Sequence, residues 1–242
     1  MGALELVKLQ ARAWGIGLDA QRLGHLDKFA RLLGDYEEAN VIGTRDKREV
    51  LLEHVLDSLS CFLFKPLGEA ERLADVGSGG GLPGLPIKLV APQVRVTLVE
   101  GTAKKARFLR RTLQTMSLDG VRVVNERAEE VGRAGEHREG YDVTTARAVA
   151  RLAVVAEYCV PLLRVGGHAI SMKGSLDPEE ISEGQRAAEK LGAEVSEIIR
   201  VPRLPEIGEK QRSLVIVRKV GETPNRYPRS VGVPAKRPLG MV

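Results

Sequence analysis

The sequence predicts an α/β protein in which helices cover a mostly parallel sheet and a helical extension precedes it. Three observations support this fold class. From about residue 72, short apolar runs alternate with helical stretches, which is the rhythm of a parallel sheet covered by helices. A glycine-rich segment follows the first apolar run. Before residue 66, apolar residues recur at helical spacing instead.

Residues 1–65 are expected to form the helical extension. Its clearest apolar stripe consists of Leu23, Leu26, Phe29, Ala30 and Leu33. Further along, Asp46 is a candidate N-cap with Glu49 three residues later, as in a capping box. We expect that helix to bury Val50, Leu51, Val55, Leu56 and Leu59.

The main domain is expected over residues 66–220. Its predicted parallel strands are Arg72–Val76, Val94–Val99, Val121–Asn125, Tyr141–Ala146 and His168–Met172. The predicted helices between and after them are Pro83–Leu89, Ala103–Met116, Arg151–Leu163 and Pro178–Leu191. Two further strands are expected near Val195–Val201 and Ser213–Val217. The connection between these two strands, residues 202–212, carries Pro205 and Gly208 but no helical stripe, so we expect the last strand pair to be antiparallel.

Residues 221–242 are expected to form a basic, proline-rich tail that cannot pack a core of its own. Its basic residues are Arg226, Arg229, Lys236 and Arg237. Tyr227, within the tail, is a candidate for stacking on a nucleic-acid base.

Composition indicates a cytoplasmic protein with ordinary core-forming capacity. The net charge of +5 and the pI near 9.3 are compatible with a nucleic-acid partner without proving one. Cys61 and Cys159 stand in no metal-binding spacing, so we expect two reduced thiols and no metal site. The N-terminus does not resemble a signal peptide, and no apolar run approaches the roughly 18 residues needed to span a bilayer.

The most informative segment is residues 75–84, DVGSGGGLPG, which lies between a predicted strand and a predicted helix. Glycines there permit positive φ and let the backbone approach a ligand at the carboxyl end of the strand. The pattern in register with the strand is Asp75-x-Gly77-x-Gly79-x-Gly81. It is typical of the Rossmann-like fold of class I methyltransferases that use S-adenosylmethionine (SAM).

Two other interpretations of this segment are weaker. The dinucleotide pattern GxGxxG fails at Leu82 when it starts at Gly77. Started at Gly79, it fits through Gly84 but lies two residues late relative to the strand. A glycine-rich turn that binds nothing would lower stability without serving a function.

Acidic residues after the next two strands support an adenosine-containing ligand. Glu100 follows the second strand, where a carboxylate can accept hydrogen bonds from ribose hydroxyls of either SAM or NAD. Ala128 and Glu129 follow the third strand, where a residue pair commonly brackets the adenine. Each acid could instead be an ordinary solvated charge.

Several segments together resemble one known family. They are Asn40–Asp46, His54–Leu59, Asp75–Pro86, Lys104–Leu109, Ala146–Ala148, Met172–Gly174 and Tyr227–Leu239. In order and spacing they resemble the bacterial 16S rRNA guanine-N7 methyltransferases of the RsmG family, also known as glucose-inhibited division protein B (GidB). The resemblance runs from about residue 40 to the end of the chain. Two departures are Gly43, which precedes Thr44 where the family usually has Asn-Leu-Thr, and Ser78, which stands where threonine is usual.

The resemblance implies SAM as methyl donor and a guanine in the decoding region of 16S rRNA as acceptor. The family's SAM contacts correspond here to Gly77, Leu82, Ala128, Glu129 and Arg147. The expected partners are 16S rRNA, the small ribosomal subunit or its precursor. We expect neither DNA nor a membrane as a partner, and we expect a monomer.

The acceptor atom decides which catalytic groups are needed. Guanine N7 already carries a lone pair, so it needs no general base before it attacks a sulfonium methyl group. We therefore assign no strict catalytic acid or base, and correct placement can supply about 7–11 kcal/mol of the barrier. The chain has no Pro-Cys pair for cytosine-C5 chemistry and no Asn/Asp-Pro-Pro-Tyr/Phe motif for adenine amino methylation.

Arg147 and Lys173 end the fourth and fifth predicted strands on the ligand side of the sheet. They are candidates to position the RNA backbone or the target guanine, and the alternative is that each pairs with a nearby acid. His54 and Asp57 share one face of a predicted helix near the glycine loop. A lone histidine on a partly apolar helix is more often structural than functional.

Contacts to RNA phosphates are expected from the helix that begins at Ala103. Its basic residues are Lys104, Lys105, Arg107, Arg110 and Arg111. Part of this set could be an ordinary solvated face. Because an A-form major groove hides N7, we expect an unpaired or splayed-out target.

Three alternative functions remain open. A class I methyltransferase could act on another RNA, a protein or a small molecule, and RNA-dependent methyl transfer would separate these cases. An NAD-dependent dehydrogenase requires the pattern that Leu82 interrupts. A non-enzymatic rRNA-binding protein would not need the intact glycine loop and Glu100.

Overall fold

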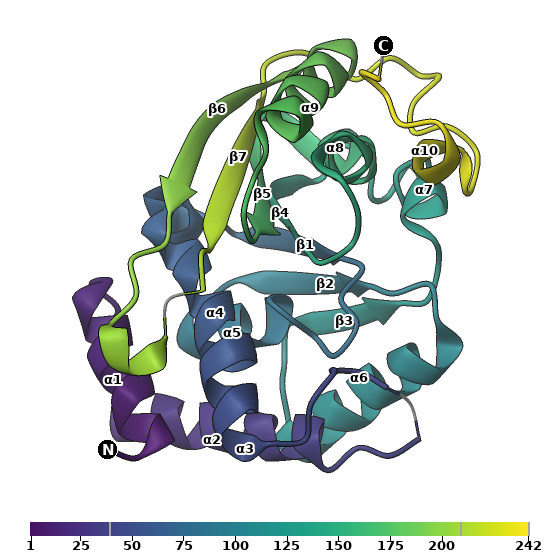
Figure 1. The fold of residues 1–242 in the computed structure, drawn as a ribbon. Helices are drawn as coiled ribbons and strands as arrows, with labels where there is room; N and C mark the ends of the chain where they lie inside the picture. The colour runs from purple at the N-terminus through teal and green to yellow at the C-terminus, as the bar shows by residue number, and fades with distance from the viewer. Residues whose placement is uncertain (39, 209, 242) are drawn as a thin grey trace.

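The computed structural model describes residues 1–242 except Ala39, Glu209 and Val242. Its centre is a seven-stranded sheet in the order β3-β2-β1-β4-β5-β7-β6 (Figure 1). The strands are β1 (Arg72–Val76), β2 (Arg95–Val99), β3 (Val121–Val124), β4 (Tyr141–Arg147), β5 (Leu163–Lys173), β6 (Ala193–Arg200) and β7 (Ser213–Lys219). Strands β1 to β5 pair in parallel, whereas β7 is antiparallel to both β5 and β6. The predicted fold class, including the antiparallel last pair, is confirmed.

The main difference from the predicted strands is the start of β5. It begins at Leu163 rather than at His168, because Leu163 already pairs with Tyr141 of β4, and an irregularity in register separates this pair from the pairing of His168 with Val143. Glycines inside a strand often mark a bulge. Gly166, with φ of 83°, and Gly167 give this stretch the sequence character of a turn.

Helices cover both faces of the sheet. The sheet therefore lies between two hydrophobic cores, one under the helices of each face. The helices of the main domain are α5 (Gly84–Val90), α6 (Ala103–Met116), α7 (Ala128–Val131), α8 (Leu152–Cys159) and α9 (Pro178–Lys190). Successive strand residues point to opposite faces, so Leu73 belongs to the core under α5 and α6, and Ala74 to the core under α8 and α9. Both cysteines, Cys61 and Cys159, are free, as expected, and both are buried.

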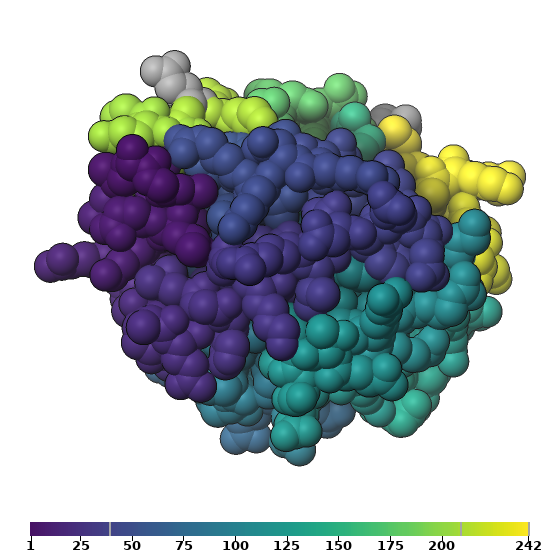
Figure 2. All heavy atoms as spheres, turned by 90° about the horizontal axis from the view of Figure 1, so that it is seen from below, coloured from purple at the N-terminus to yellow at the C-terminus, as the bar shows by residue number. Residues whose placement is uncertain are grey.

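The N-terminal helices share the first core with the sheet. They are α1 (Ala3–Ala13), α2 (Ala20–Gly34), α3 (Lys47–Glu49), a π-helical segment (Val50–Val55) and α4 (Leu56–Leu59). The side chain of Asp46 accepts a hydrogen bond from the Glu49 backbone N–H at 2.7 Å and so caps α3. Figure 2 shows the N-terminal helices, in purple and blue, over much of one face of the molecule. This packing places the π-helical segment beside the end of β4.

The C-terminal tail is folded against the opposite face, beside α7 and α8 (Figure 1). Arginine side chains hold its backbone, with Arg133 donating to the carbonyl of Pro228 at 2.8 Å and Arg138 to that of Tyr227 at 2.8 Å. The Tyr227 ring is 7% exposed and belongs to the second core. The prediction that Tyr227 stacks on a base is therefore wrong for this structure, because its ring is used in packing. Val242, the last residue of the predicted tail, lies outside the described residues.

The strand order fixes where a ligand site can form. From β1 the chain proceeds to β2 on one side, while β4 lies on the other, so the carboxyl ends of β1 and β4 flank the topological switch point. Open α/β sheets bind ligands in the crevice at this point. The glycine loop follows β1 and Arg147 ends β4, so both face the same crevice.

Within the described residues, no helix combines the length and the apolar character needed to cross a membrane.

Candidate active site

The glycine loop after β1 has a backbone that side chains would disrupt. Gly77, Gly79 and Gly81 have φ of 70°, 55° and 85°. A Cβ on Gly77 would lie 2.8 Å from a methyl carbon of Val149, and one on Gly81 would lie 2.5 Å from the Leu85 side chain. These conformations and close approaches explain why glycine is required at both positions.

Asp75 anchors the loop from beneath. Its fully buried carboxylate accepts hydrogen bonds from the Thr145 hydroxyl at 2.8 Å and from the Gly84 backbone N–H at 3.2 Å. Burial raises the pKa of Asp75 to about 6, although these hydrogen bonds act in the opposite direction. Asp75 therefore ties β1 to β4 and to the start of α5, and it does not face a ligand.

Glu100 links the loop to the end of β2. One carboxylate oxygen accepts from the Gly79 N–H at 2.9 Å, and the other accepts from the Thr102 N–H at 2.7 Å. A carboxylate offers about four acceptor positions, so two remain for further donors. Glu100 is thus held in one orientation and can still accept hydrogen bonds from hydroxyl groups.

A cavity of about 270 Å³ lies beside the glycine loop. This glycine-loop cavity is lined by Val76, Gly77, Val99, Glu100, Gly101, Glu126, Arg127, Ala128, Glu129, Val149, Tyr158, Val231, Gly232 and Ala235. Four of the predicted cofactor residues therefore meet there: Gly77, Glu100, Ala128 and Glu129.

The other predicted cofactor residues take different positions. Gly79 binds Glu100 rather than lining the cavity. Gly81 and Leu82 close the turn, with both N–H groups donating to the Ser78 carbonyl at 2.7 and 3.0 Å. Their part in binding a cofactor stays a prediction.

Sequence reasoning missed the far wall of this cavity. Glu129 accepts a hydrogen bond from the Gly232 N–H at 2.9 Å, which brings the tail against the start of α7. Burial, followed by the charge of Glu129, raises the pKa of Tyr158 to about 12, so its phenol stays protonated. No local motif marks these residues, because they meet only when the tail folds back over α7 and α8.

An ion pair with α8 also fastens the tail. Glu157 of α8 is fully buried and accepts from the Arg229 backbone N–H at 2.8 Å and from its guanidinium at 2.9 and 2.5 Å. Arg229 therefore serves the fold, although the sequence suggested an RNA-binding charge.

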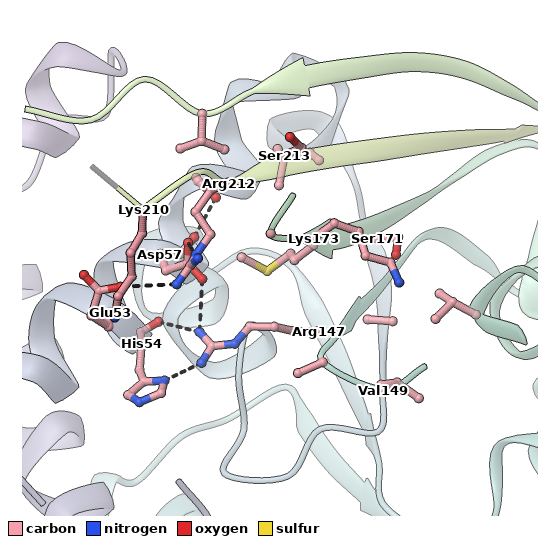
Figure 3. Close-up of a pocket in the computed structure, with 18 of the residues that line it drawn as sticks. Glu53, His54, Asp57, Arg147, Val149, Ser171, Lys173, Lys210, Arg212 and Ser213 are labelled. Carbon is pink, nitrogen blue, oxygen red and sulfur yellow. Dashed lines mark hydrogen bonds and ion pairs between the residues drawn. The ribbon is translucent and has the colours of Figure 1, made fainter. Parts of the chain in front are cut away.

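Arg147 lines a second cavity, of about 320 Å³, at the carboxyl ends of β4 and β5. We call it the arginine cavity; its polar lining includes Glu49, Glu53, His54, Asp57, Ser60, Arg147, Ser171, Lys173, Lys210, Arg212 and Ser213. Figure 3 shows Arg147 extending from β4 toward His54 and Asp57. Its guanidinium donates to the His54 carbonyl at 3.1 Å, to Asp57 at 3.4 Å and to the His54 ring nitrogen Nδ1.

This network fixes the charge state of His54. Burial, followed by the charge of Arg147, lowers its pKa to about 4, so the imidazole is neutral at pH 7. A guanidinium has no acceptor, so Nδ1 must accept and the ring proton must reside on Nε2. The predicted pair, His54 and Asp57, therefore does meet, and it meets around Arg147.

Acidic side chains of the π-helical segment and α4 gather the surrounding cations. Asp57 contacts Arg212 at 3.3 Å as well as Arg147. Burial raises the pKa of Asp57, and the two guanidinium groups oppose that rise. Glu53 contacts Arg203 at 2.6 Å, Arg212 at 3.2 Å and Lys210 at 3.5 Å. Burial alone would raise the pKa of Glu53, but these cations outweigh it and the net pKa is lowered.

Lys173 closes the other side of the arginine cavity. Its ammonium group donates to the Ala150 carbonyl at 2.6 Å and to Glu180 at 2.7 Å. Both Lys173 and Arg147 thus pair with a nearby acid, which is the alternative that the sequence left open. Their roles as substrate-positioning residues stay predictions.

Val149 separates the two cavities and lines both of them. The preceding residue, Ala148, has φ of 53°, a left-handed conformation that is unfavourable for a residue with a Cβ. Strained residues of this kind cluster at functional sites. The turn after Arg147 therefore lies between the glycine-loop cavity and the arginine cavity.

The basic helix α6 presents its charges to solvent. Lys104, Arg107, Arg110 and Arg111 are exposed, and Arg111 pairs with Glu38 at 3.3 Å. Contact with RNA stays a prediction for this helix.

Comparison with known proteins gives one consistent result. The family model described as rRNA small subunit methyltransferase G (GidB) matches residues 23–215. A protein of that name from Rubrobacter xylanophilus is 57% identical over 238 residues, which cover 98% of this chain and 91% of the relative. Another from Pelotomaculum thermopropionicum is 43% identical and covers 97% of this chain and 98% of the relative.

Solved structures with low sequence identity share the fold. The crystal structure of geranyl diphosphate C-methyltransferase from Streptomyces coelicolor, in complex with S-adenosyl-L-homocysteine, matches with a TM-score of 0.57 at 17% identity. That match covers 91% of this chain and 99% of the other. A putative sarcosine dimethylglycine methyltransferase from Galdieria sulphuraria matches with a TM-score of 0.55 at 12% identity, covering 81% and 99%. These likenesses show a class I methyltransferase fold.

Proposed function

The chain belongs to the rRNA small subunit methyltransferase G family, and from this premise we propose that it methylates N7 of one guanine in the decoding region of 16S rRNA. The methyl donor is SAM. The family is shown by a model that covers most of the chain and by relatives that are similar over nearly its full length. The proposal places the protein in the bacterial cytoplasm, where small subunits are assembled.

The glycine-loop cavity fits SAM. Gly77 lines this cavity and packs against Val149 so closely that a Cβ there would collide with it. Glu100 keeps acceptor positions for ribose hydroxyls, while Ala128 and Glu129 flank the place for an adenine. When bound there, SAM supplies a methyl group on a sulfonium, which is already electrophilic.

The residues of the arginine cavity would hold the guanine. Attack by N7 uses its lone pair, so no proton has to leave before the methyl group transfers. Neutral His54, which is hydrogen-bonded to Arg147, accordingly acts as a support for the guanidinium and not as a base. Arg147 and Lys173, each held by an acid, position the nucleotide at the border marked by Val149.

One observation carries this proposal: the cavity that fits the cofactor and the charged cavity meet at Val149 at the switch point of the sheet. Placing two reactants in line within a shielded site is the contribution that this reaction requires.

The proposal can be tested with isotopically labelled SAM and small subunits, or 16S rRNA, from cells that lack the modification. Nuclease digestion and mass spectrometry would locate the label. We expect one 7-methylguanosine in the decoding region. SAM binding without rRNA methylation would contradict the proposal and favour another RNA or a small molecule as substrate.

A further inference from the structure

We propose that a third cavity, beside the arginine cavity, binds a single-stranded RNA nucleotide adjacent to the target guanine and holds its phosphate. This inference rests on the proposed function, because it assumes that the substrate is RNA. The nucleotide cavity has a volume of about 590 Å³. It is lined by Ser175, Leu176, Ile181, Ile198, Arg200, Val201, Arg203, Pro205, Gly208, Lys210, Gln211, Arg212 and Ser213.

Its position suits a neighbour of the target base. Arg200, at the carboxyl end of β6, pairs with Ser213 of β7, and Ser213 pairs with Lys173 of β5. The nucleotide cavity and the arginine cavity share Val201, Lys210, Arg212 and Ser213. Figure 3 shows Lys210 and Arg212 above Glu53 and Asp57. A strand passing through the arginine cavity would therefore continue past these side chains.

The charge around the nucleotide cavity favours an anion. Its described lining holds four basic side chains and no acidic one. Three of these cations, Arg203, Lys210 and Arg212, share the single carboxylate of Glu53. Arg212 also contacts Asp57, but Arg147 uses the same carboxylate. The cluster thus keeps positive charge that a phosphate would complement.

The remaining lining favours a nucleotide over a free phosphate. Leu176, Ile181, Ile198 and Val201 give the cavity apolar walls. Ile198 is 39% exposed, although it is a large apolar side chain on a strand. A base and its ribose would cover these aliphatic walls while the phosphate meets the basic side chains.

Two exposed residues allow a test that spares the fold. Arg200→Gln and Lys210→Gln remove charge from the nucleotide cavity but leave the Glu53 pairs with Arg203 and Arg212. Lys190→Gln is the matched control, because this exposed residue ends α9 just before the amino end of β6, whereas Arg200 lies at the carboxyl end of that strand. Lys210→Arg retains the charge.

The measurement is fluorescence anisotropy of a labelled single-stranded RNA from the decoding region, at several salt concentrations. We expect the double variant to weaken RNA binding about tenfold and to lower the slope of log affinity against log salt by about 0.7 for each charge removed. We expect S-adenosylhomocysteine binding to be unchanged. Lys190→Gln and Lys210→Arg should behave like the wild type.

Unchanged affinity and salt slope in the double variant would overturn the inference. The failure of the proposed function would look different, because the wild type would then bind RNA without methylating it. In that case, weaker RNA binding by the Arg200→Gln, Lys210→Gln double variant would still support the nucleotide cavity. Inorganic phosphate and unlabelled RNA oligonucleotide would also be compared, at equal concentration, as competitors of the labelled RNA. If phosphate competed equally well, the cavity would be an anion site and the nucleotide assignment would be wrong.

Discussion

The two cavities that meet at Val149 are built in different ways. The glycine-loop cavity depends on backbone geometry: a turn with three positive φ angles, and a Glu100 carboxylate held by two backbone N–H groups. The arginine cavity depends on side chains from distant segments, joined by ion pairs around Glu53 and Asp57. Backbone geometry suits a cofactor of constant shape, whereas paired charges can exchange partners when an RNA phosphate arrives.

The largest effect is expected from a side chain in the glycine loop. Gly77→Val would force a Cβ to within 2.8 Å of Val149 at a φ of 70°. We expect S-adenosylhomocysteine binding, measured by calorimetry, to fall at least 100-fold. Gly68→Ala is the control, because a Cβ there meets nothing within 4 Å. Intact cofactor binding by Gly77→Val would contradict the claim that the glycine-loop cavity depends on backbone geometry.

The next effect concerns the tail that walls the glycine-loop cavity. Arg229→Ala leaves the fully buried Glu157 without its guanidinium partner. Such a loss typically lowers the free energy of unfolding by about 3–5 kcal/mol. Urea denaturation would measure it, with Arg226→Ala, an exposed tail residue, as the control. Equal stability of the two variants would show that the tail does not depend on this pair.

A smaller and more selective effect is expected in the arginine cavity. Asp57→Asn keeps the shape of the side chain but removes the charge that holds Arg147 and Arg212. We expect kcat/KM for rRNA to fall about 10- to 100-fold, since misplacement of a positioning group weakens catalysis without abolishing it. The Kd of S-adenosylhomocysteine should change less than threefold. An equally large loss of affinity for S-adenosylhomocysteine would show that the arginine cavity contributes to cofactor binding as well.

The smallest effect is a pH dependence of stability. Folded His54 takes up a proton near pH 4, whereas an unfolded histidine does so near 6.5, so the unfolded state binds more protons between these values. As the pH falls from 6.5 to 4, the free energy of unfolding of the wild type should therefore fall by about 1–2 kcal/mol relative to that of His54→Gln. This figure allows for partial solvent screening.

The difference between the two proteins is the quantity to measure for His54. Asp75 has a pKa raised to about 6 in the folded state and shifts stability in the opposite direction over much of this range. Asp75 is present in both proteins, so its contribution cancels. Parallel stability curves for the wild type and His54→Gln would contradict the burial of a neutral histidine beside Arg147.

The elements, and the meeting of four candidate cofactor residues at one cavity, could be predicted because their signals are local. The bounds of β1 and α6 agree with the sequence patterns, and Gly77, Glu100, Ala128 and Glu129 do line one cavity. Each lies just after a strand of the same parallel sheet, so strand order alone brings them together.

The rest of the site required information that local patterns do not carry. Glu53 meets Arg203 and Arg212 across about 150 residues of chain, through the packing of a helix against a strand connection. Arg229 and Tyr227 looked like RNA-binding residues because exposure cannot be inferred from residue type. Their burial depends on α8, whose Glu157 has no sequence signature of its own.

The central claim is transfer to a lone pair on guanine N7, and a single atom can test it. Small subunits would be reconstituted with 16S rRNA that carries 7-deazaguanosine at the mapped position, where carbon replaces N7. We predict that the protein binds these particles as well as unmodified ones but transfers no labelled methyl group to them. Methyl transfer to the substituted nucleotide at the normal rate would contradict the claim and indicate a different acceptor atom.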